Sequence, residues 1–413
     1  SYVFPKKSFW LLALGAASSS VCGYGVAGWL PLFFMRSFDL TLLQTSWYYA
    51  GIALIGGVLG IWQLVYIGAA IPCGALLDRM GARWALLLGA MIIAASGYMR
   101  GMAEGATLLY LAVALFGIGG PIVSAGAPKV IARWFAGSER GFAMGIYITG
   151  PNIGGIIAFS LTNSVLMPAF GGDWRAVLWL WATISVAGGL LWLAIASLPN
   201  VRARDDAEEA AARKEGQGGG VAELLRIPAV PIILVMSVGI FTYNHGLNNW
   251  LPELLRVSGM TPAEAGYWAA VPTLIGILGS LVIPRLATPA RRLPILAGLF
   301  VAAFLSCLLI GTVWQPGLMA GLVLQGIARS SLMTIAILIL VETPGIGTRR
   351  AGAASGLFFA AAEVGGAGGP FALGMLYDMT GGFQAGLNLL AGLSAAMLIC
   401  VGLLYRLSRR ERT

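Results

Sequence analysis

The chain has 413 residues, of which 58% are hydrophobic and only 10% are charged, and its mean hydropathy is +0.84. A water-soluble domain carries charge on about a quarter of its residues, so this composition excludes a soluble globular protein. In a chain this apolar, the net charge of +9 indicates anchoring against anionic lipid and argues against nucleic-acid binding.

Apolar stretches long enough to cross a bilayer as helices recur along the whole chain. Charged and Pro/Gly-rich breaks separate them. The predicted spans are 9–35, 45–72, 84–103, 107–132, 140–166, 176–198, 229–255, 264–284, 293–313, 316–341, 352–376 and 383–405. The sequence therefore predicts an all-α membrane protein with twelve transmembrane helices.

One long hydrophilic stretch interrupts this pattern after the sixth span. It reads NVRARDDAEEAAARKEGQGGGVAELLRIP, is rich in charge and contains a glycine run, which is typical of a linker. We therefore predict a six-helix bundle over 1–198, a cytoplasmic linker over 199–228 and a second six-helix bundle over 229–413.

Basic residues predict the orientation, because Lys and Arg near span ends are retained on the cytoplasmic side. With both termini inside, nearly all of the 26 Lys and Arg residues fall on that side. The exceptions are Arg36, Arg100, Arg175 and Arg256, which fall outside, and Arg329, which falls within a span. We expect both termini in the cytoplasm of a multi-pass plasma-membrane protein.

The two predicted bundles repeat each other in sequence. The triplet Trp-Leu-Pro occurs in GWLPLFF (28–34) and again in NWLPELL (249–255), and Trp47 and Trp268 keep the same offset of 221. In the fifth and eleventh spans an offset of 211 pairs Gly141 with Gly352, Gly145 with Gly356, Gly154 with Gly365 and Gly155 with Gly366. Repeated glycines are expected where helix backbones approach closely, so the halves are predicted to be a duplicated and pseudo-symmetric unit.

Twelve spans in two repeated halves with a central linker resemble the major facilitator superfamily of secondary transporters. The sharpest motif is GALLDRMGAR, residues 74–83, placed after the second predicted span. The resemblance implies a conformational latch at the cytoplasmic surface, formed by Gly74, Asp78, Arg79, Gly81 and Arg83. The corresponding second-half stretch, PRLATPARRL, keeps Arg291 and Arg292 but has no acidic residue, so it does not predict a second latch.

Shorter stretches resemble particular branches of that superfamily. GPNIGG (150–155) is similar to the end of an antiporter signature. GYMRG (97–101), PKVIARWF (128–135) and WLPELL are similar to cyanate-permease-like carriers. ARWFAGSERGFAMGI is similar to oxalate/formate-type organic anion carriers.

Two charged residues lie near the centre of predicted spans, Arg329 in the tenth and Glu363 in the eleventh. Charge at that depth is costly, so it normally faces a wet cavity or a partner. A guanidinium stays charged and fits a carboxylate, which makes Arg329 a candidate anchor for an anionic substrate. A buried carboxylate can bind and release a proton in each cycle, which makes Glu363 the candidate coupling site. In the alternative interpretation the two residues pair permanently and hold their helices together.

Polar side chains also concentrate in YNHGLNNWLP on the seventh span. His245, Asn248 and Asn249 are therefore candidate substrate contacts, although His245 as a hydrogen-bonded residue at an outer gate is the alternative. Further candidates are an amide that is the repeat partner of Glu363 and three aromatic side chains: Asn152, Tyr24, Tyr147 and Phe359. Lys129 and Arg133, at the inner end of the fourth span, are expected to extend to the cytoplasmic surface.

These observations favour a carrier that moves a small organic anion by alternating access, with proton coupling or exchange, as symport or antiport. The alternative is a proton antiporter for multiple drugs or hydrophobic cations, and a lipid flippase is a further alternative. An enzyme is not expected, because one histidine and scattered cysteines provide no catalytic or metal cluster. We predict no cofactor, no metal and no nucleic-acid partner, and we expect a monomer in the bilayer.

Overall fold

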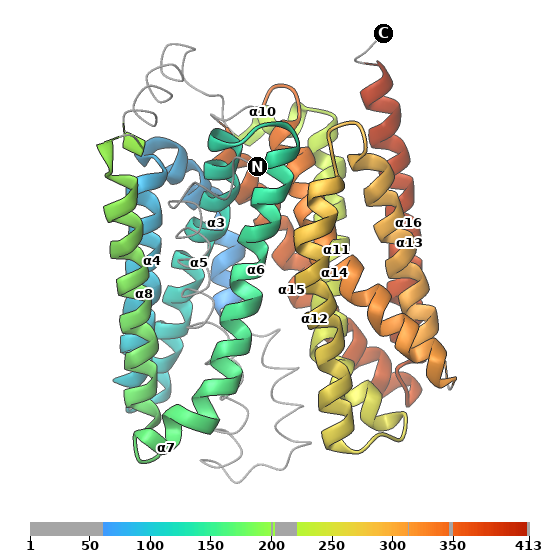
Figure 1. Cartoon of the computed structure of the whole chain (residues 1–413), viewed down its shortest axis with the longest axis horizontal. Helices are drawn as coiled ribbons and strands as arrows, with labels where there is room; N and C mark the ends of the chain where they lie inside the picture. The colour runs from blue at the N-terminus through green and yellow to red at the C-terminus, as the bar shows by residue number, and fades with distance from the viewer. Residues whose placement is uncertain (1–60, 200, 203–220, 313, 347–349, 411–413) are drawn as a thin grey trace. The chain divides into compact units, whose positions relative to one another are not determined.

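In the computed structural model, the described part of the chain consists of helices and their short connections, and it covers residues 61–199, 201–202, 221–312, 314–346 and 350–410 (Figure 1). The helices are α3 (Ile61–Met80), α4 (Ala82–Gly101), α5 (Ala106–Trp134), α6 (Gly137–Leu161), the π-helix Thr162–Leu166, α7 (Met167–Ala169), α8 (Trp174–Ala196), α10 (Val221–Arg226), α11 (Ala229–Val257), α12 (Pro262–Leu286), α13 (Arg292–Ile310), α14 (Gln315–Glu342), α15 (Ala351–Thr380) and α16 (Gln384–Arg410). Within these residues, 11 helices are long and apolar enough to cross a membrane. The predicted all-α membrane fold is confirmed.

The helix bounds follow most of the predicted spans, with one clear exception. The first predicted span, 9–35, lies outside the described residues, as does the start of the second. The prediction that the second span ends at 72 is wrong, because α3 continues to Met80. Its last two turns hold Gly74, Asp78 and Arg79, so most of the motif GALLDRMGAR is helical, and the turn comes at Gly81 with φ +76°. The charge of Asp78 is tolerated inside a helix because several donors bind it, as described below.

The chain divides into two compact units. The described helices of the first unit are α3, α4, α5 and α8, together with α6 from Ile146 onward and α15 as far as Ala360. The second unit contains α11 to α14 and α16, together with the start of α6 up to Gly145 and the remainder of α15. Two helices, α6 and α15, therefore begin in one unit and continue in the other.

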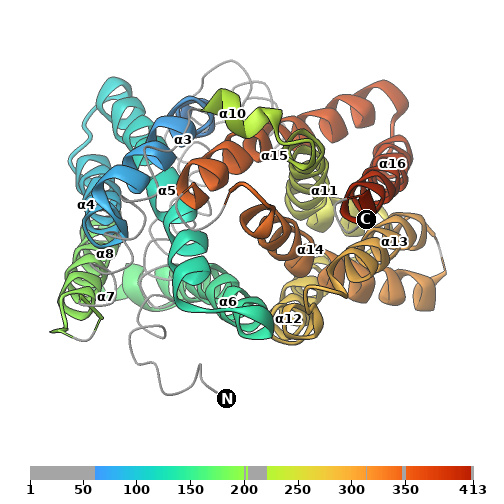
Figure 2. The same cartoon turned by 90° about the horizontal axis from the view of Figure 1, so that it is seen from above.

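Helix packing repeats between the units. In the first unit the main contacts join α4 with α5, α4 with α8 and α3 with α5. In the second unit they join α13 with α14, α13 with α16 and α12 with α14. The view from above shows α13 beside both α14 and α16 (Figure 2). The two sets of contacts are the same when helices are matched in order, α3 with α12, α4 with α13, α5 with α14 and α8 with α16. A duplicated unit is expected to repeat its helix contacts in this way.

The repeated glycines explain how the first turns of α6 and α15 pack, each in a different unit from the rest of its helix. In the second unit, Gly141 and Gly145 of α6 lie against carbonyl oxygens of α12, and a Cβ at Gly145 would collide with Ser280 O. In the first unit, their repeat partners Gly352 and Gly356 of α15 lie against α3, and a Cβ at Gly356 would collide with Ala70 O. Glycine is required at these positions because any side chain would separate the backbones.

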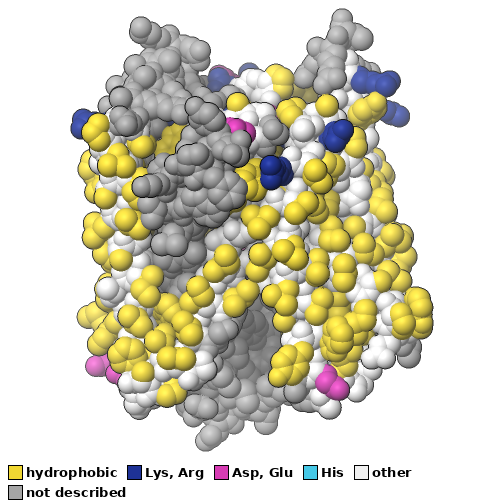
Figure 3. Space-filling model, viewed as in Figure 1, with side chains coloured by type: hydrophobic (Ala, Val, Ile, Leu, Met, Phe, Trp, Pro, Cys, Tyr) yellow, Lys and Arg dark blue, Asp and Glu magenta, His cyan; other side chains and the backbone are white. Residues whose placement is uncertain are grey.

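The outer faces of the helices are suited to lipid. Along α12, Leu274, Leu278 and Val282 are more than half exposed and recur every four residues, so they form one apolar face. In the space-filling view, hydrophobic side chains cover the middle of the second unit, and Lys and Arg side chains lie toward its upper end (Figure 3). This pattern fits a bundle whose apolar band is surrounded by hydrocarbon.

Candidate functional site

A glycine-rich stretch of α15 places two titratable side chains together in the second unit. A Cβ at Gly365 would collide with Val238 O of α11, and one at Gly369 would collide with Thr242 O. A Cβ at Gly366 would lie 2.8 Å from Glu363 Oε2 and 3.2 Å from His245 Nδ1. Both distances are measured from the same point, so Glu363 Oε2 and His245 Nδ1 are at most about 6 Å apart.

These two groups are shielded from water to different degrees. Glu363 is only 5% exposed. The His245 ring is half-buried and stacks on Phe241, with a centroid separation of 5.2 Å and an interplanar angle of 24°. Arg329 on α14 is near these two groups, because Asn244, the residue before His245 on α11, donates to its main-chain oxygen at 3.4 Å. The Tyr243 hydroxyl shares a hydrogen bond of 2.7 Å with Ser306. An acid, a base and a permanent cation therefore lie in one region of the second unit.

Arg329 is half-buried and held by neighbouring helices. Its Nη1 donates to Thr273 Oγ1 of α12 at 3.3 Å. From α11, Asn244 Nδ2 donates to the main-chain oxygen of Arg329 at 3.4 Å. The sequence prediction of a cation within the tenth span therefore corresponds to a guanidinium at the junction of α11, α12 and α14.

The other predicted substrate contacts divide between the two units. Asn248 and Asn249 are exposed on α11 in the second unit. Tyr147, Asn152 and Phe359 belong to the first unit. There Tyr147 is buried, the Asn152 amide donates to Ile148 O at 3.2 Å, and Phe359 packs edge-on against Phe358. Tyr24 lies outside the described residues.

One residue of this region was not predicted from the sequence. Gln325 lies one helical turn before Arg329 on α14 and is 1% exposed. Within the described part of the chain, neither its side-chain nitrogen nor its side-chain oxygen has a hydrogen-bond partner. The Oδ1 atom of Asn244 is also buried and has no hydrogen-bond partner among the residues that the structure describes. An amide-bearing residue four positions from Arg329 in an apolar helix was the available signal.

A second polar site lies in the first unit, at the end of α3. Asp78 Oδ1 accepts hydrogen bonds from Lys129 Nζ at 2.6 Å and from Gly352 N at 3.1 Å, while its Oδ2 accepts one from Ala353 N at 2.7 Å. The two main-chain donors belong to the first turn of α15, where a carboxylate is stabilised by free N–H groups and by the helix dipole. The motif therefore connects α3, α5 and α15.

The cation of this site is Lys129, which corrects the expectation that it extends to the surface. Lys129 is 2% exposed and donates also to Leu77 O at 3.0 Å. The motif residues Arg79 and Arg83 form no ion pair with a described residue, and the Arg83 guanidinium lies over the ring of Trp84. The latch role that the resemblance implies for Arg79 and Arg83 stays a prediction.

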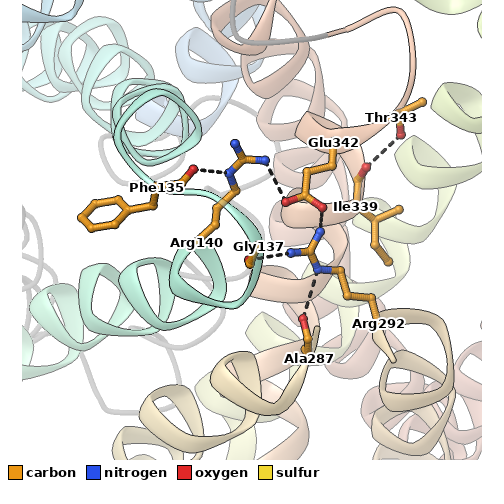
Figure 4. A network of polar contacts seen from close by, with 8 residues as sticks. All are labelled: Phe135, Gly137, Arg140, Ala287, Arg292, Ile339, Glu342 and Thr343. Carbon is orange, nitrogen blue, oxygen red and sulfur yellow. Dashed lines mark hydrogen bonds and ion pairs between the residues drawn. The ribbon is translucent and has the colours of Figure 1, made fainter. Parts of the chain in front are cut away.

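The second unit has its own ion-pair network, although its α12–α13 loop lacks an acidic residue (Figure 4). Glu342, the last residue of α14, accepts from Arg140 Nη1 at 2.8 Å through Oε1 and forms an ion pair with Arg292 through Oε2. Arg140 also donates to Phe135 O at 3.0 Å, and Arg292 donates to Ala287 O at 3.1 Å. The acid absent from the loop is thus supplied by another helix, and the network holds the first turn of α6.

The sequence matches a family model over most of its length. The model of the Major Facilitator Superfamily matches residues 12–317 and again 259–413. The chain therefore belongs to the Major Facilitator Superfamily. It is a multi-pass inner-membrane transporter and not an enzyme.

Relatives of similar sequence bear the names of transporters. A quinolone resistance transporter of Acinetobacter baumannii is 26% identical over 88% of this chain and 87% of the relative. A probable L-galactonate transporter of Escherichia coli (strain K12) is 28% identical over 60% of this chain and 58% of the relative. A probable galactarate/D-glucarate transporter of Bacillus subtilis (strain 168) is 24% identical over 84% and 83%.

Solved structures of the same fold cover nearly the whole chain. The human organic anion transporter MFSD10 has a TM-score of 0.74 at 17% identity, covering 95% of this chain and 98% of that one. The transporter FucP, in an outward conformation, has a TM-score of 0.72 at 16% identity, covering 96% and 98%. At these identities the likeness establishes the fold alone.

Proposed function

We propose that this protein carries a small organic anion across the membrane by alternating access, with Arg329 as the anchor for a substrate carboxylate. The observation that carries the proposal is a half-buried guanidinium at the junction of three helices, with a neutral threonine as one of its partners. Arg binds carboxylates through a planar fork and keeps its charge. The galactonate and galactarate/glucarate transporters among the relatives support an anionic cargo.

Glu363 is the proposed coupling residue, and His245 lies next to it. Glu363 is only 5% exposed in an apolar helix, where a negative charge loses its hydration. Binding a proton neutralises the carboxylate and so removes the free-energy cost of burying its charge. In this mechanism the anion and a proton, or a counter-substrate, cross together or in exchange. Asn248, Asn249, His245, Tyr24, Tyr147, Asn152 and Phe359 are the remaining proposed substrate contacts.

The test of the anion anchor is binding and transport by purified protein. A thermal-shift screen against carboxylates, cyanate-like anions and lipophilic cations identifies the chemical class, because a ligand that binds only the folded state raises the melting temperature. Carboxylate hits are then assayed for uptake in liposomes. We expect Arg329→Gln to abolish carboxylate binding and Arg329→Lys to weaken it at least about tenfold, since Lys has no planar fork. Unchanged carboxylate transport by both variants contradicts the proposal.

The test of coupling separates exchange from net transport. Glu363→Gln mimics a permanently protonated residue, so we expect exchange of substrate across liposomes to persist while a pH gradient no longer drives accumulation. Accumulation that still follows the pH gradient in this variant contradicts the role of Glu363.

Export of drugs or hydrophobic cations is the second candidate. The quinolone resistance transporter among the relatives favours it, as does the buried acid Glu363, which suits a cation. Dye accumulation in cells that lack the protein, reversed by expression, supports this candidate. Thermal-shift hits restricted to lipophilic cations would replace the anion proposal with it.

A further inference from the structure

Gln325 combines complete burial with unsatisfied polar atoms. Its side chain is 1% exposed, and both its amide nitrogen and its amide oxygen lack partners in the described part of the chain. Buried polar groups in native proteins are nearly always hydrogen-bonded, because an unsatisfied one loses its bonds to water. Such a group is expected to acquire its partner from a ligand or from a bound water.

The position of Gln325 favours a ligand. Residues four apart on a helix share a face with Cβ atoms about 6 Å apart, so Gln325 and Arg329 lie one turn apart on the same face of α14. Asn244, which donates to the main-chain oxygen of Arg329, contributes a second buried acceptor, its Oδ1, which no described residue binds. Unsatisfied hydrogen-bonding groups therefore occur on α11 and on α14, both next to the proposed carboxylate anchor.

The chemistry of these groups selects the ligand. A primary amide offers two donors and one acceptor, and a hydroxyl can both donate and accept, so the two are complementary. A simple ionised carboxylate without hydroxyls has no donor, so it could accept from the Gln325 amide nitrogen but would leave the oxygens of Gln325 and Asn244 without a donor. A hydroxylated carboxylate satisfies both requirements: its carboxylate binds Arg329, and a hydroxyl a few atoms away binds Gln325.

We propose that Gln325 is a specificity-determining residue that selects carboxylates bearing hydroxyl groups, with Asn244 Oδ1 as a second hydroxyl contact. This inference rests on the proposed function, because it takes Arg329 as the anchor. A site built to bind a hydroxyl discriminates strongly against the analogue that lacks it, since the buried amide is then left unpaired.

The test compares acids that differ only in their hydroxyl groups. Dissociation constants of the purified full chain are measured by calorimetry for D-glucarate against adipate, and for D-gluconate against hexanoate. We expect the wild type to bind at least one hydroxylated acid about 10- to 100-fold more tightly than its deoxy counterpart. In Gln325→Met, which keeps the length of the side chain without the amide, we expect this ratio to fall about tenfold or more while adipate and hexanoate bind as before.

A matched control separates recognition from stability. Ser355 of the first unit is also fully buried, and its hydroxyl has no partner among the described residues, so Ser355→Ala likewise removes a buried polar group of this kind. We expect Ser355→Ala to leave the ratio unchanged. If Gln325→Met does not yield folded protein, Gln325→Leu provides the same measurement.

The possible outcomes separate the two proposals. Equal affinity of the wild type for hydroxylated and deoxy acids, or an unchanged ratio in Gln325→Met, overturns the role of Gln325 and leaves the anion anchor in place. A Gln325 amide satisfied only by water would give that unchanged ratio. Carboxylate binding that is absent from the wild type, or insensitive to Arg329→Gln, overturns the proposed function itself.

Discussion

Neutralising Asp78 tests whether the motif of the first half acts through buried charge. In Asp78→Asn the side chain keeps one oxygen, but three donors, Lys129 Nζ and the main-chain nitrogens of Gly352 and Ala353, converge on the original carboxylate. The new amide nitrogen therefore faces other donors, and the ammonium of Lys129, which is 2% exposed, loses its counter-charge. Removing one partner of a buried pair typically costs about 3–5 kcal/mol, and we expect the free energy of unfolding to fall by about this amount.

A double-mutant cycle isolates the pair. Lys129→Met removes the cation while keeping most of the volume, and we expect the double variant to be more stable than the sum of the single effects by about 1–3 kcal/mol. Unfolding of the purified protein in detergent is followed by tryptophan fluorescence. The matched control is Glu253→Gln, which breaks the solvent-exposed ion pair with Arg256 and should have little effect.

Additive single effects, within about 0.5 kcal/mol, would refute the reasoning for Asp78 and Lys129. So would a strong dependence on salt, because a buried pair is screened much less than an exposed one.

Two further predictions concern the second unit. Gly145→Ala would bring a Cβ against Ser280 O and should destabilise the protein by about 1–3 kcal/mol. The control Gly298→Ala, with open space around its Cα, should leave the melting temperature unchanged or slightly raised. Equal melting temperatures for the two variants would contradict close packing at Gly145. Glu342→Gln leaves the 3% exposed Arg292 side chain without its counter-charge and should lower the free energy of unfolding by about 3 kcal/mol. Unfolding in detergent measures this, and a drop below about 1 kcal/mol would show that the network contributes little.

The fold could be predicted from the sequence because its signals are periodic and local. Apolar stretches predict the spans, and glycines at a constant offset predict the positions where α6 and α15 contact other helices. Gly141 and Gly145 meet α12, and Gly352 and Gly356 meet α3, as the duplication requires. The end of α3 was placed too early because Pro72 and Gly74 normally interrupt a helix, yet Pro72 lies inside α3. The three donors around Asp78 make its charge acceptable within the helix.

The polar sites depend on contacts between distant segments, which the sequence does not reveal. Lys129 lies 51 residues from Asp78, and Arg140 lies 202 residues from Glu342. By sequence position alone, Lys129 is a basic residue at a helix end, where extension to the surface is the usual outcome. Gln325 is an ordinary polar residue in an apolar helix until its burial and its lack of partners are known.

The Asp78 and Glu342 networks bind corresponding helix starts, those of α15 and α6, through different donors. Each fixes the start of a helix that continues into the other unit: Asp78 binds the first turn of α15, and Glu342 binds Arg140 in the first turn of α6. The bonds of Asp78 lie within the first unit, and those of Glu342 lie within the second. Both helices contain a proline beyond the crossing point, Pro151 and Pro370, where a helix bends at low cost. Asp78 binds main-chain N–H groups of α15, so its bonds need no particular side-chain donor in that turn, although a Cβ at Gly352 would collide with the carboxylate. The Glu342 network instead depends on two arginine side chains and is lost with them.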